Sequence, residues 1–316
     1  MDKYFEKVIN GQSLNEDDLK KLNTYDTKKL FKISNELRSE FCGNKGELCS
    51  IMNIKSGHCS EDCKFCAQSA HYNTNIESYD LKSKNEILER ALELEKNGVK
   101  RFSIVSSGKG IKDEEFPKLL EIIELLKEKT SLKLCASLGI IDAKTLLKLK
   151  EAGLSRYHHN VETSYRYYKN ICTSHSYESR IECIKNAQEV GLEVCSGFIA
   201  GLGESIDDII DISILLRNLN INSIPINLLN PIPNTLFENS DIMSAEEYFK
   251  IVSIVRFVNP KAWIRYAGGR GLIGDNQRKG LSAGINSSIT GELLTTNGGS
   301  IEDDFLMFKE MGFDLI

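Results

Sequence analysis

Three cysteines early in the chain are spaced so that they could hold one metal cluster together. Cys59, Cys63 and Cys66 form a CxxxCxxC run that directly follows an apolar stretch. Three thiolates this close can bind three corners of a cubic [4Fe–4S] cluster and leave the fourth iron open to a substrate or cofactor. A zinc site is the alternative, because His58 or His71 could supply the fourth ligand that zinc prefers.

The composition favours metal binding over disulfide bonding. The 316 residues include nine cysteines, an odd number, and the segment after Met1 lacks the apolar core of a secretory signal. The formal net charge of −5 gives no electrostatic reason to expect nucleic acid or an acidic membrane as partner. No run approaches the roughly 18 apolar residues of a membrane-spanning helix. We therefore expect a cytoplasmic protein with neither membrane nor nucleic acid as partner.

Hydrophobic periodicity predicts the elements that position these residues. Gly98, Gly153 and Gly191 each end a segment of helical periodicity and precede a short apolar or β-prone run, which is typical of helix-to-strand junctions. The expected strands are residues 48–55, 101–106, 132–137, 155–161, 192–198, 223–228, 262–266 and 283–287. Strands separated by helices favour an α/β fold, a (β/α)8 TIM-type barrel, with a doubly wound open sheet as the alternative.

The N-terminal part of the chain has a different pattern. Residues 1–41 are predicted to form an N-terminal helical extension, because residues 15–18 resemble a helix start and Leu19 and Leu22 follow it. Residues 42–316 are predicted to form the barrel, including a C-terminal region. In such a barrel, chemistry is expected at the C-terminal ends of the strands and in the loops after them.

The cysteine run also resembles a known signature. CxxxCxxC with an aromatic residue, here Phe65, before the last cysteine is similar to the motif of the radical S-adenosylmethionine superfamily. The resemblance implies that the amine and carboxylate of S-adenosylmethionine bind the open iron. It also implies that reduction of the cluster yields a 5′-deoxyadenosyl radical, which abstracts hydrogen from unactivated carbon.

Further blocks narrow the resemblance to the biotin synthase family within that superfamily. They are residues 53–69, 157–164, 194–204, 225–229, 264–270 and 293–296. This resemblance implies that dethiobiotin is converted to biotin by radical sulfur insertion, with sulfide from an auxiliary iron–sulfur cluster. It also implies flavodoxin or ferredoxin as electron donor and a homodimeric assembly.

The resemblance implies roles for matching positions. Cys59, Cys63 and Cys66 would carry the radical-generating cluster. The residues expected to bind S-adenosylmethionine are Phe65, Glu162, Gly201 and Glu204. Asn160 and Asn227 would bind the ureido group of dethiobiotin, since an amide offers both a donor and an acceptor. Cys135, Cys195 and Arg265 would surround the auxiliary cluster, with Cys195 counted among the catalytic residues.

One position departs from the family pattern. The family has cysteine in an Arg-Phe-Cys run on the second strand, and this chain has Ser103 there. A serine hydroxyl stays protonated where thiols ionise, so it is a poor iron ligand. We expect Cys49 to replace it, giving an auxiliary cluster bound by Cys49, Cys135 and Cys195, either [2Fe–2S] or a four-iron cluster with an extra sulfide. Cys172 is a rival or additional ligand.

Two other classes of function stay open at this point. One is a related radical enzyme of the hydrogenase maturase or methylornithine synthase type, in which the auxiliary cysteines would be dispensable. The other is a non-catalytic iron–sulfur or zinc protein. We assign no catalytic role to His158, His159 or His175, because histidines are more often exposed or satisfied within a core.

Overall fold

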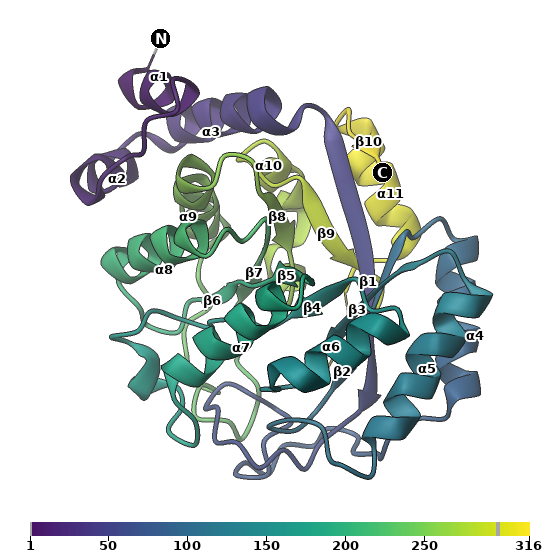
Figure 1. Ribbon diagram of the computed structural model, residues 1–316. Helices are drawn as coiled ribbons and strands as arrows, with labels where there is room; N and C mark the ends of the chain where they lie inside the picture. Colours follow the sequence, from purple (N-terminus) through teal and green to yellow (C-terminus); the bar gives the residue numbers. More distant parts are fainter. Residues whose placement is uncertain (1, 295–297) are drawn as a thin grey trace.

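The strands of the computed structural model, which describes residues 2–294 and 298–316, form a closed parallel barrel (Figure 1). In chain order they are β1 Lys45–Lys55, β2 Arg101–Ser106, β3 Lys133–Ser137, β4 Arg156–His158, β5 Glu193–Cys195, β6 Phe198–Ala200, β7 Ser223–Leu228, β8 Trp263–Tyr266, β9 Ser287–Thr290 and β10 Asp314–Leu315. β1 pairs with both β2 and β9, which closes the ring. β5 and β6 both pair with β7 and together form one of the staves of the barrel, so the closed ring contains eight strand positions. The predicted TIM-type barrel is confirmed, and the open-sheet alternative is wrong.

Helices surround the barrel on its outer face (Figure 1). They are α1 Lys3–Ile9, α2 Glu16–Asn23, α3 Thr27–Cys42, α4 Lys84–Lys96, α5 Phe116–Lys129, α6 Ala143–Ala152, α7 Tyr177–Glu189, α8 Ile206–Asn218, α9 Ala245–Val258, α10 Gln277–Leu281 and α11 Ile301–Glu310, with 3-10 turns η1 Tyr168–Asn170 and η2 Arg270–Asn276. The expected N-terminal helical extension corresponds to α1–α3; α2 packs on α8 and α9, α3 packs on α9, and α1 packs on α3. A division between residues 41 and 42 stays a prediction; α3 ends at Cys42.

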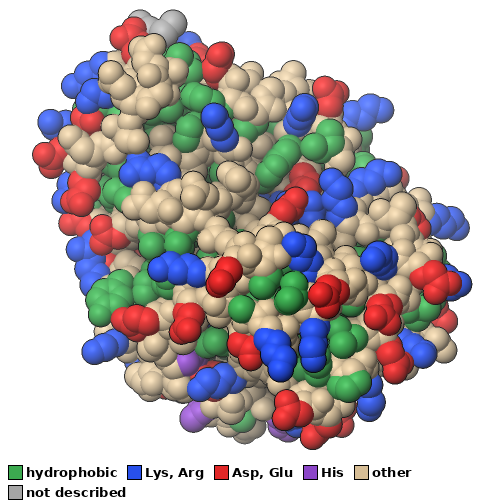
Figure 2. Space-filling model, viewed as in Figure 1, with side chains coloured by type: hydrophobic (Ala, Val, Ile, Leu, Met, Phe, Trp, Pro, Cys, Tyr) green, Lys and Arg blue, Asp and Glu red, His purple; other side chains and the backbone are tan. Residues whose placement is uncertain are grey.

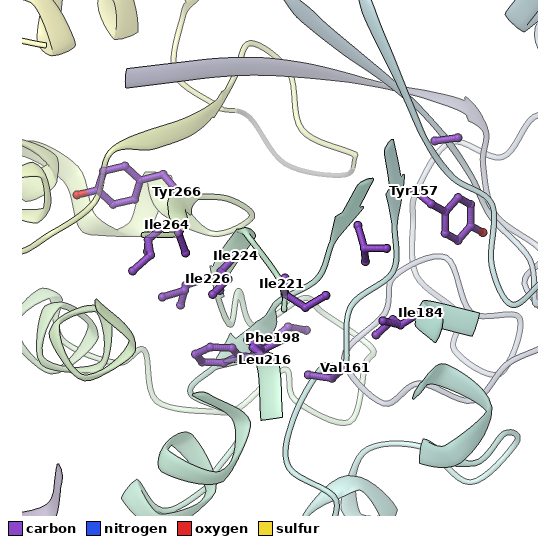
Figure 3. Packing of buried hydrophobic residues seen from close by; sticks show 14 of the residues in the cluster. Tyr157, Val161, Ile184, Phe198, Leu216, Ile221, Ile224, Ile226, Ile264 and Tyr266 are labelled. Carbon is purple, nitrogen blue, oxygen red and sulfur yellow. The ribbon is translucent and has the colours of Figure 1, made fainter. Parts of the chain in front are cut away.

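Hydrophobic and polar side chains alternate along the strands, so that a hydrophobic outer layer is separated from a polar barrel interior. Figure 3 shows the outer layer, in which side chains from the strands pack beneath the helices. Ile224 and Ile226 on β7, with Ile264 and Tyr266 on β8, are fully buried there. The residues between them point into the barrel, because successive side chains of a strand face opposite sides. The interior positions are therefore free to carry chemistry while the outer ones hold the helices in place.

Several predicted strand boundaries are wrong. The strand expected at 155–161 is β4, which ends at His158, and the strand expected at 48–55 is β1, which begins at Lys45. Two further differences have identifiable reasons. The single strand expected at 192–198 is broken between β5 and β6. At the break, a Cβ on Gly197 would lie 1.8 Å from the Pro225 carbonyl oxygen. The strand expected at 283–287 is β9, which begins at Ser287 and not at 283, because Gly284 has a φ of +113° that an extended strand does not allow.

Gly197→Ala is expected to destabilise the protein strongly. The added methyl group would collide with backbone of the neighbouring strand, which has no freedom to rotate away. Overpacking at such sites costs about 1–3 kcal/mol or more in the free energy of unfolding. Chemical denaturation measures this cost. Gly46→Ala is the control, because Gly46 also lacks a positive φ and its added Cβ would meet only side-chain atoms of Leu315 and Phe308, at 3.0 Å. Equal losses in the two variants would contradict the explanation.

The surface shows no segregation of charge on the face in Figure 2, where acidic and basic side chains are interspersed. Within residues 2–294 and 298–316, no helix combines the length and the apolar character that crossing a membrane requires.

Candidate active site

One cavity of about 270 Å³ inside the barrel collects most of the predicted site residues. Those that line it are Cys49, Phe65, Cys66, Cys135, Asn160, Cys195, Asn227 and Arg265. They come from six different positions of the ring and from the loop after β1. The other predicted site residues, Cys59, Cys63, Glu162, Gly201 and Glu204, do not line the cavity itself.

The loop that carries the cysteine triplet is held by its own backbone. The Cys59 amide donates to the Gln68 carbonyl at 3.0 Å, and the Cys66 amide donates to the Cys63 carbonyl at 2.9 Å. Burial raises the pKa of Cys66 to about 11, so this thiol needs a cation to ionise near neutral pH. His71, a candidate zinc ligand, has its Nε2 3.0 Å from the Ser60 carbonyl oxygen and is engaged there.

Of the residues expected to bind S-adenosylmethionine, Phe65 lies in the loop after β1, Glu162 lies after β4, and Gly201 and Glu204 lie after β6. Glu162 adopts a φ of +66°, and its Oε1 is 3.4 Å from Nη1 of Arg180. One carboxylate oxygen of Glu204 accepts the Gly201 amide at 2.8 Å. The other is buried without a hydrogen-bond partner, and burial raises the pKa of this carboxyl group. Glu204 therefore fixes the backbone turn that follows β6.

Asn160 and Asn227 are oriented by the backbone around them. The Asn160 side-chain oxygen accepts the Gly197 amide at 3.0 Å, and the Asn227 oxygen accepts the Gly268 amide at 2.9 Å. The broken strand at Gly197 thus has a direct effect on the site, since it turns an amide towards Asn160. Each oxygen keeps a second lone pair.

Three buried thiols share the deeper part of the cavity. Cys49 Sγ accepts from Arg265 Nη1 at 2.8 Å. Cys135 Sγ accepts from Arg101 Nη1 at 3.4 Å. Cys195 Sγ accepts from the Ser223 hydroxyl at 3.2 Å. We call these three cysteines the thiol floor.

A buried charged layer lies beneath the thiol floor. Glu47 contacts Arg101 at 3.1 Å, Arg156 at 3.3 Å and Arg265 at 2.5 Å. Although burial alone would raise it, the pKa of Glu47 is held well below its usual range by these arginines. Glu193, whose side chain is largely exposed, also contacts Arg101 and Arg156, so three guanidinium groups face two carboxylates and one positive charge is in excess. The thiol floor therefore fits an anionic group such as an iron–sulfur cluster, because thiolates would compensate that excess.

The thiols of the floor differ in acidity. Burial raises the pKa of Cys49 to about 11 and also raises that of Cys135. For Cys195, the effect of burial is outweighed by His158 and Arg265, which lower its pKa to about 6. His158 was given no role from the sequence. It lies two residues before Asn160, and because side chains two residues apart on a strand face the same side, this spacing could have predicted that His158 faces the barrel interior.

The structure also gives the positions of Ser103 and Cys172, the two residues in question as ligands of the auxiliary cluster. Ser103 lines the cavity and lies opposite Cys135 in the β2–β3 register, where the family pattern has a cysteine. Cys172, the rival ligand for the auxiliary cluster, lies instead beside Cys63, with a sulfur–sulfur distance of 3.8 Å. A hydrogen bond between these thiols lowers the pKa of Cys172 and raises that of Cys63.

Arg101, Arg156 and Glu47 were not identified from sequence.

Solved structures share this fold. Methylornithine synthase superposes with a TM-score of 0.85 at 22% identity, covering 99% of this chain and 97% of that one. The hydrogenase maturase HydG gives 0.83 at 16% identity, covering 99% and 74%. These similarities concern the fold alone.

Sequence similarity decides between the related families. Residues 53–216 match the profile described as "Radical SAM superfamily", and residues 225–314 match the "Biotin and Thiamin Synthesis associated domain". Biotin synthase of Clostridioides difficile is 49% identical over 311 residues, covering 98% of this chain and 94% of that protein. Biotin synthase of Fusobacterium nucleatum is 50% identical over 289 residues, covering 90% and 80%. The chain belongs to the biotin synthase family.

Membership confirms the family predicted from the sequence. Biotin synthases are sulfur-inserting radical enzymes that use a [4Fe–4S] cluster and S-adenosylmethionine, and an auxiliary iron–sulfur cluster is typical of them. The family relationship implies dethiobiotin as substrate and an external electron donor. Of the motifs that indicated it, Thr295 and Thr296 lie outside the described residues.

Proposed function

We propose that this biotin synthase converts dethiobiotin to biotin inside the barrel, with the cysteine triplet above the substrate and the thiol floor below it. The observation that supports this arrangement is that Cys66, Asn160, Asn227 and the three floor thiols line one cavity. Reactants held in line in one cavity gain from proximity and from exclusion of water.

Cys59, Cys63 and Cys66 would hold the [4Fe–4S] cluster. Bound there, the cluster and S-adenosylmethionine supply the one-electron chemistry that activates unreactive C–H bonds. Glu162 would accept hydrogen bonds from the ribose hydroxyls, and its contact with Arg180 at 3.4 Å holds the carboxylate in place. Phe65 and the turn from Gly201 to Glu204 would enclose the cofactor.

Asn160 and Asn227 would recognise the ureido group. Each side-chain oxygen accepts one hydrogen bond from a backbone amide and has two lone pairs. Its second lone pair is therefore available to a ureido N–H. The amide nitrogen of Asn160 lies 3.3 Å from Glu162 Oε2, which leaves one N–H for the ureido oxygen. This arrangement would also connect substrate and cofactor through neighbouring side chains.

Asn227→Ala is expected to raise the KM for dethiobiotin about tenfold, because one hydrogen bond of roughly 1.4 kcal/mol is lost. The KM for S-adenosylmethionine should stay near its wild-type value. Steady-state kinetics with each substrate varied separately measures both. A change confined to S-adenosylmethionine would contradict the assignment.

Cys49, Cys135 and Cys195, with Arg265, would hold the auxiliary cluster whose sulfide enters the product. Cys49 would take the part that cysteine at position 103 has in the family pattern. Whether this cluster is [2Fe–2S] or a four-iron cluster with an extra sulfide is decided by iron and sulfide counts. Flavodoxin or ferredoxin as donor, a homodimeric assembly and a cytoplasmic location complete the proposal.

An anaerobic turnover assay tests the proposal. The reconstituted protein is given reductant, S-adenosylmethionine and dethiobiotin, and iron and sulfide are counted before and after. We expect biotin and 5′-deoxyadenosine together with loss of about one sulfide per biotin. Deoxyadenosine without biotin would refute the substrate, and biotin without loss of sulfide would refute the sulfur source.

A further inference from the structure

Cys172 lies beside the cysteine triplet and has no role in the reaction described so far. It follows the turn η1 and is 2% exposed. Its sulfur forms a hydrogen bond with the sulfur of Cys63, at a distance of 3.8 Å. A thiol is both a weak donor and a weak acceptor, so this bond can run in either direction. Its direction decides what Cys172 can contribute to the triplet.

Binding of iron would fix the direction of this hydrogen bond. In the cluster-free chain, Cys63 donates to Cys172. Cysteine binds iron as a thiolate, which has lost its proton and can only accept hydrogen bonds. Once Cys63 is bound to iron, the hydrogen bond can therefore exist only if Cys172 is the donor.

The carboxylate nearest to Cys172 has no lone pair left for the thiol proton. Oδ1 of Asp62 is 3.2 Å from the Cys172 sulfur. The same oxygen accepts the backbone amides of Thr173 at 2.9 Å and Ser174 at 3.0 Å. A carboxylate oxygen has two lone pairs, and the two amides occupy both. A thiol is a weaker donor than an amide and does not displace them.

The other polar neighbours of Cys172 are engaged as well. Nδ1 of His175 is 3.3 Å from the Cys172 sulfur and 2.6 Å from Oε2 of Glu61. A carboxylate only accepts, so Nδ1 carries a proton directed at Glu61 and has no lone pair for the thiol. The Ser174 oxygen, 3.6 Å from the sulfur, accepts the Asp62 amide at 3.1 Å. The iron-bound sulfur of the triplet is therefore the anionic acceptor that remains.

Backbone hydrogen bonds fix the separation between the two sulfurs. The Lys64 amide donates to the Ile171 carbonyl at 2.9 Å, which joins the residue after Cys63 to the residue before Cys172. The Cys172 amide donates to the Tyr168 carbonyl at 3.1 Å. The donor is therefore held beside the acceptor by the fold itself, which lowers the entropic cost of the hydrogen bond.

We propose that Cys172 is a positioning residue whose thiol donates a hydrogen bond to the Cys63 sulfur and thereby raises the reduction potential of the [4Fe–4S] cluster. Hydrogen bonds to the ligating sulfurs are among the factors that set the potential of an iron–sulfur cluster. A donor stabilises the extra negative charge of the reduced cluster, so its presence favours reduction. The inference rests on the proposed role of Cys63 as a cluster ligand.

A potentiometric titration of the reconstituted full chain, followed by electron paramagnetic resonance, tests this role. The signal that changes when S-adenosylmethionine is added identifies the triplet cluster. We expect Cys172→Ala to load this cluster and to lower its midpoint potential. At the midpoint of the unsubstituted chain, the ratio of reduced to oxidised cluster should fall about three- to tenfold, as for one lost hydrogen bond to an anion. Cys172→Ser keeps a donor and should recover most of the loss. Cys183→Ala removes a buried thiol on α7 and is the matched control.

The exchangeable proton of the hydrogen bond gives a second readout. In D₂O, electron–nuclear double resonance of the reduced cluster should show one deuteron coupling that is absent in Cys172→Ala and present in Cys172→Ser. An unchanged midpoint potential in Cys172→Ala would overturn the proposal. Failure of both variants to load the cluster would make Cys172 a ligand and overturn it too. Neither outcome bears on the substrate, which the turnover assay for biotin tests separately.

Discussion

Replacing Cys49 with alanine is expected to lower biotin formation by more than about 100-fold while cleavage of S-adenosylmethionine continues. The sulfur of Cys49 accepts from Arg265 at 2.8 Å in the thiol floor, where Ser103 offers no thiolate. Changes next to metal ligands already cost about 10- to 100-fold, and loss of a ligand should cost more. The measurement is the ratio of biotin to 5′-deoxyadenosine per turnover.

Cys183→Ala is the matched control for this variant. Cys183 is also buried but lies on α7, outside the cavity, and should keep the wild-type ratio. A second variant, Ser103→Cys combined with Cys49→Ala, should recover part of the activity, since position 103 lies opposite Cys135. Full biotin formation by Cys49→Ala would show that the family's missing ligand is not replaced from β1.

Glu47→Gln is expected to lower the free energy of unfolding by about 3–5 kcal/mol, because three buried guanidinium groups lose the buried carboxylate that they share. Urea denaturation of the cluster-free chain measures the loss. Glu193→Gln is the matched control. Glu193 contacts Arg101 and Arg156 too, but its side chain is 59% exposed, so its loss should cost less than about 1 kcal/mol.

The same variant carries a pH signature. Because the pKa of Glu47 is lowered in the folded chain, its stabilisation is present above its unfolded value of 4.5 and is lost as the pH falls towards the folded value. The unsubstituted chain should therefore lose stability below about pH 4.5, and Glu47→Gln should lose less over that interval. Parallel pH curves for the two would show that the arginines do not depend on this carboxylate.

Much of the barrel could be predicted from the sequence, because its strands alternate regularly. Residues 101–106 and 223–228 were predicted with their observed boundaries as β2 and β7. The break at Gly197 could not be predicted, since it depends on contact with Pro225 of a neighbouring strand. Closure is likewise a long-range property: it appears in the pairing of β1 with β9.

The predicted site residues were found mainly by resemblance, and the structure adds their environment. Motif spacing identified the triplet, and alternation placed Cys135 and Cys195 on strands. Neither signal could show that Glu47 lies among three arginines, because these residues are distant in sequence and unremarkable singly. Cys172 shows the same limit: only the folded chain places it beside Cys63 and not in the thiol floor.

The charged layer beneath the thiol floor has a consequence for the order of events. Glu47, Arg101, Arg156 and Arg265 are between 1% and 7% exposed and fill the end of the barrel at which its strands begin. Iron and sulfide for the proposed auxiliary cluster would then enter from the opposite end, past Phe65 and Asn227, the region that dethiobiotin would occupy. A substrate in place would bar resupply, and an incomplete floor would give the substrate nothing to react with. Resupply of iron and sulfide and formation of biotin would therefore be consecutive steps, and the product would have to leave before the floor could be rebuilt.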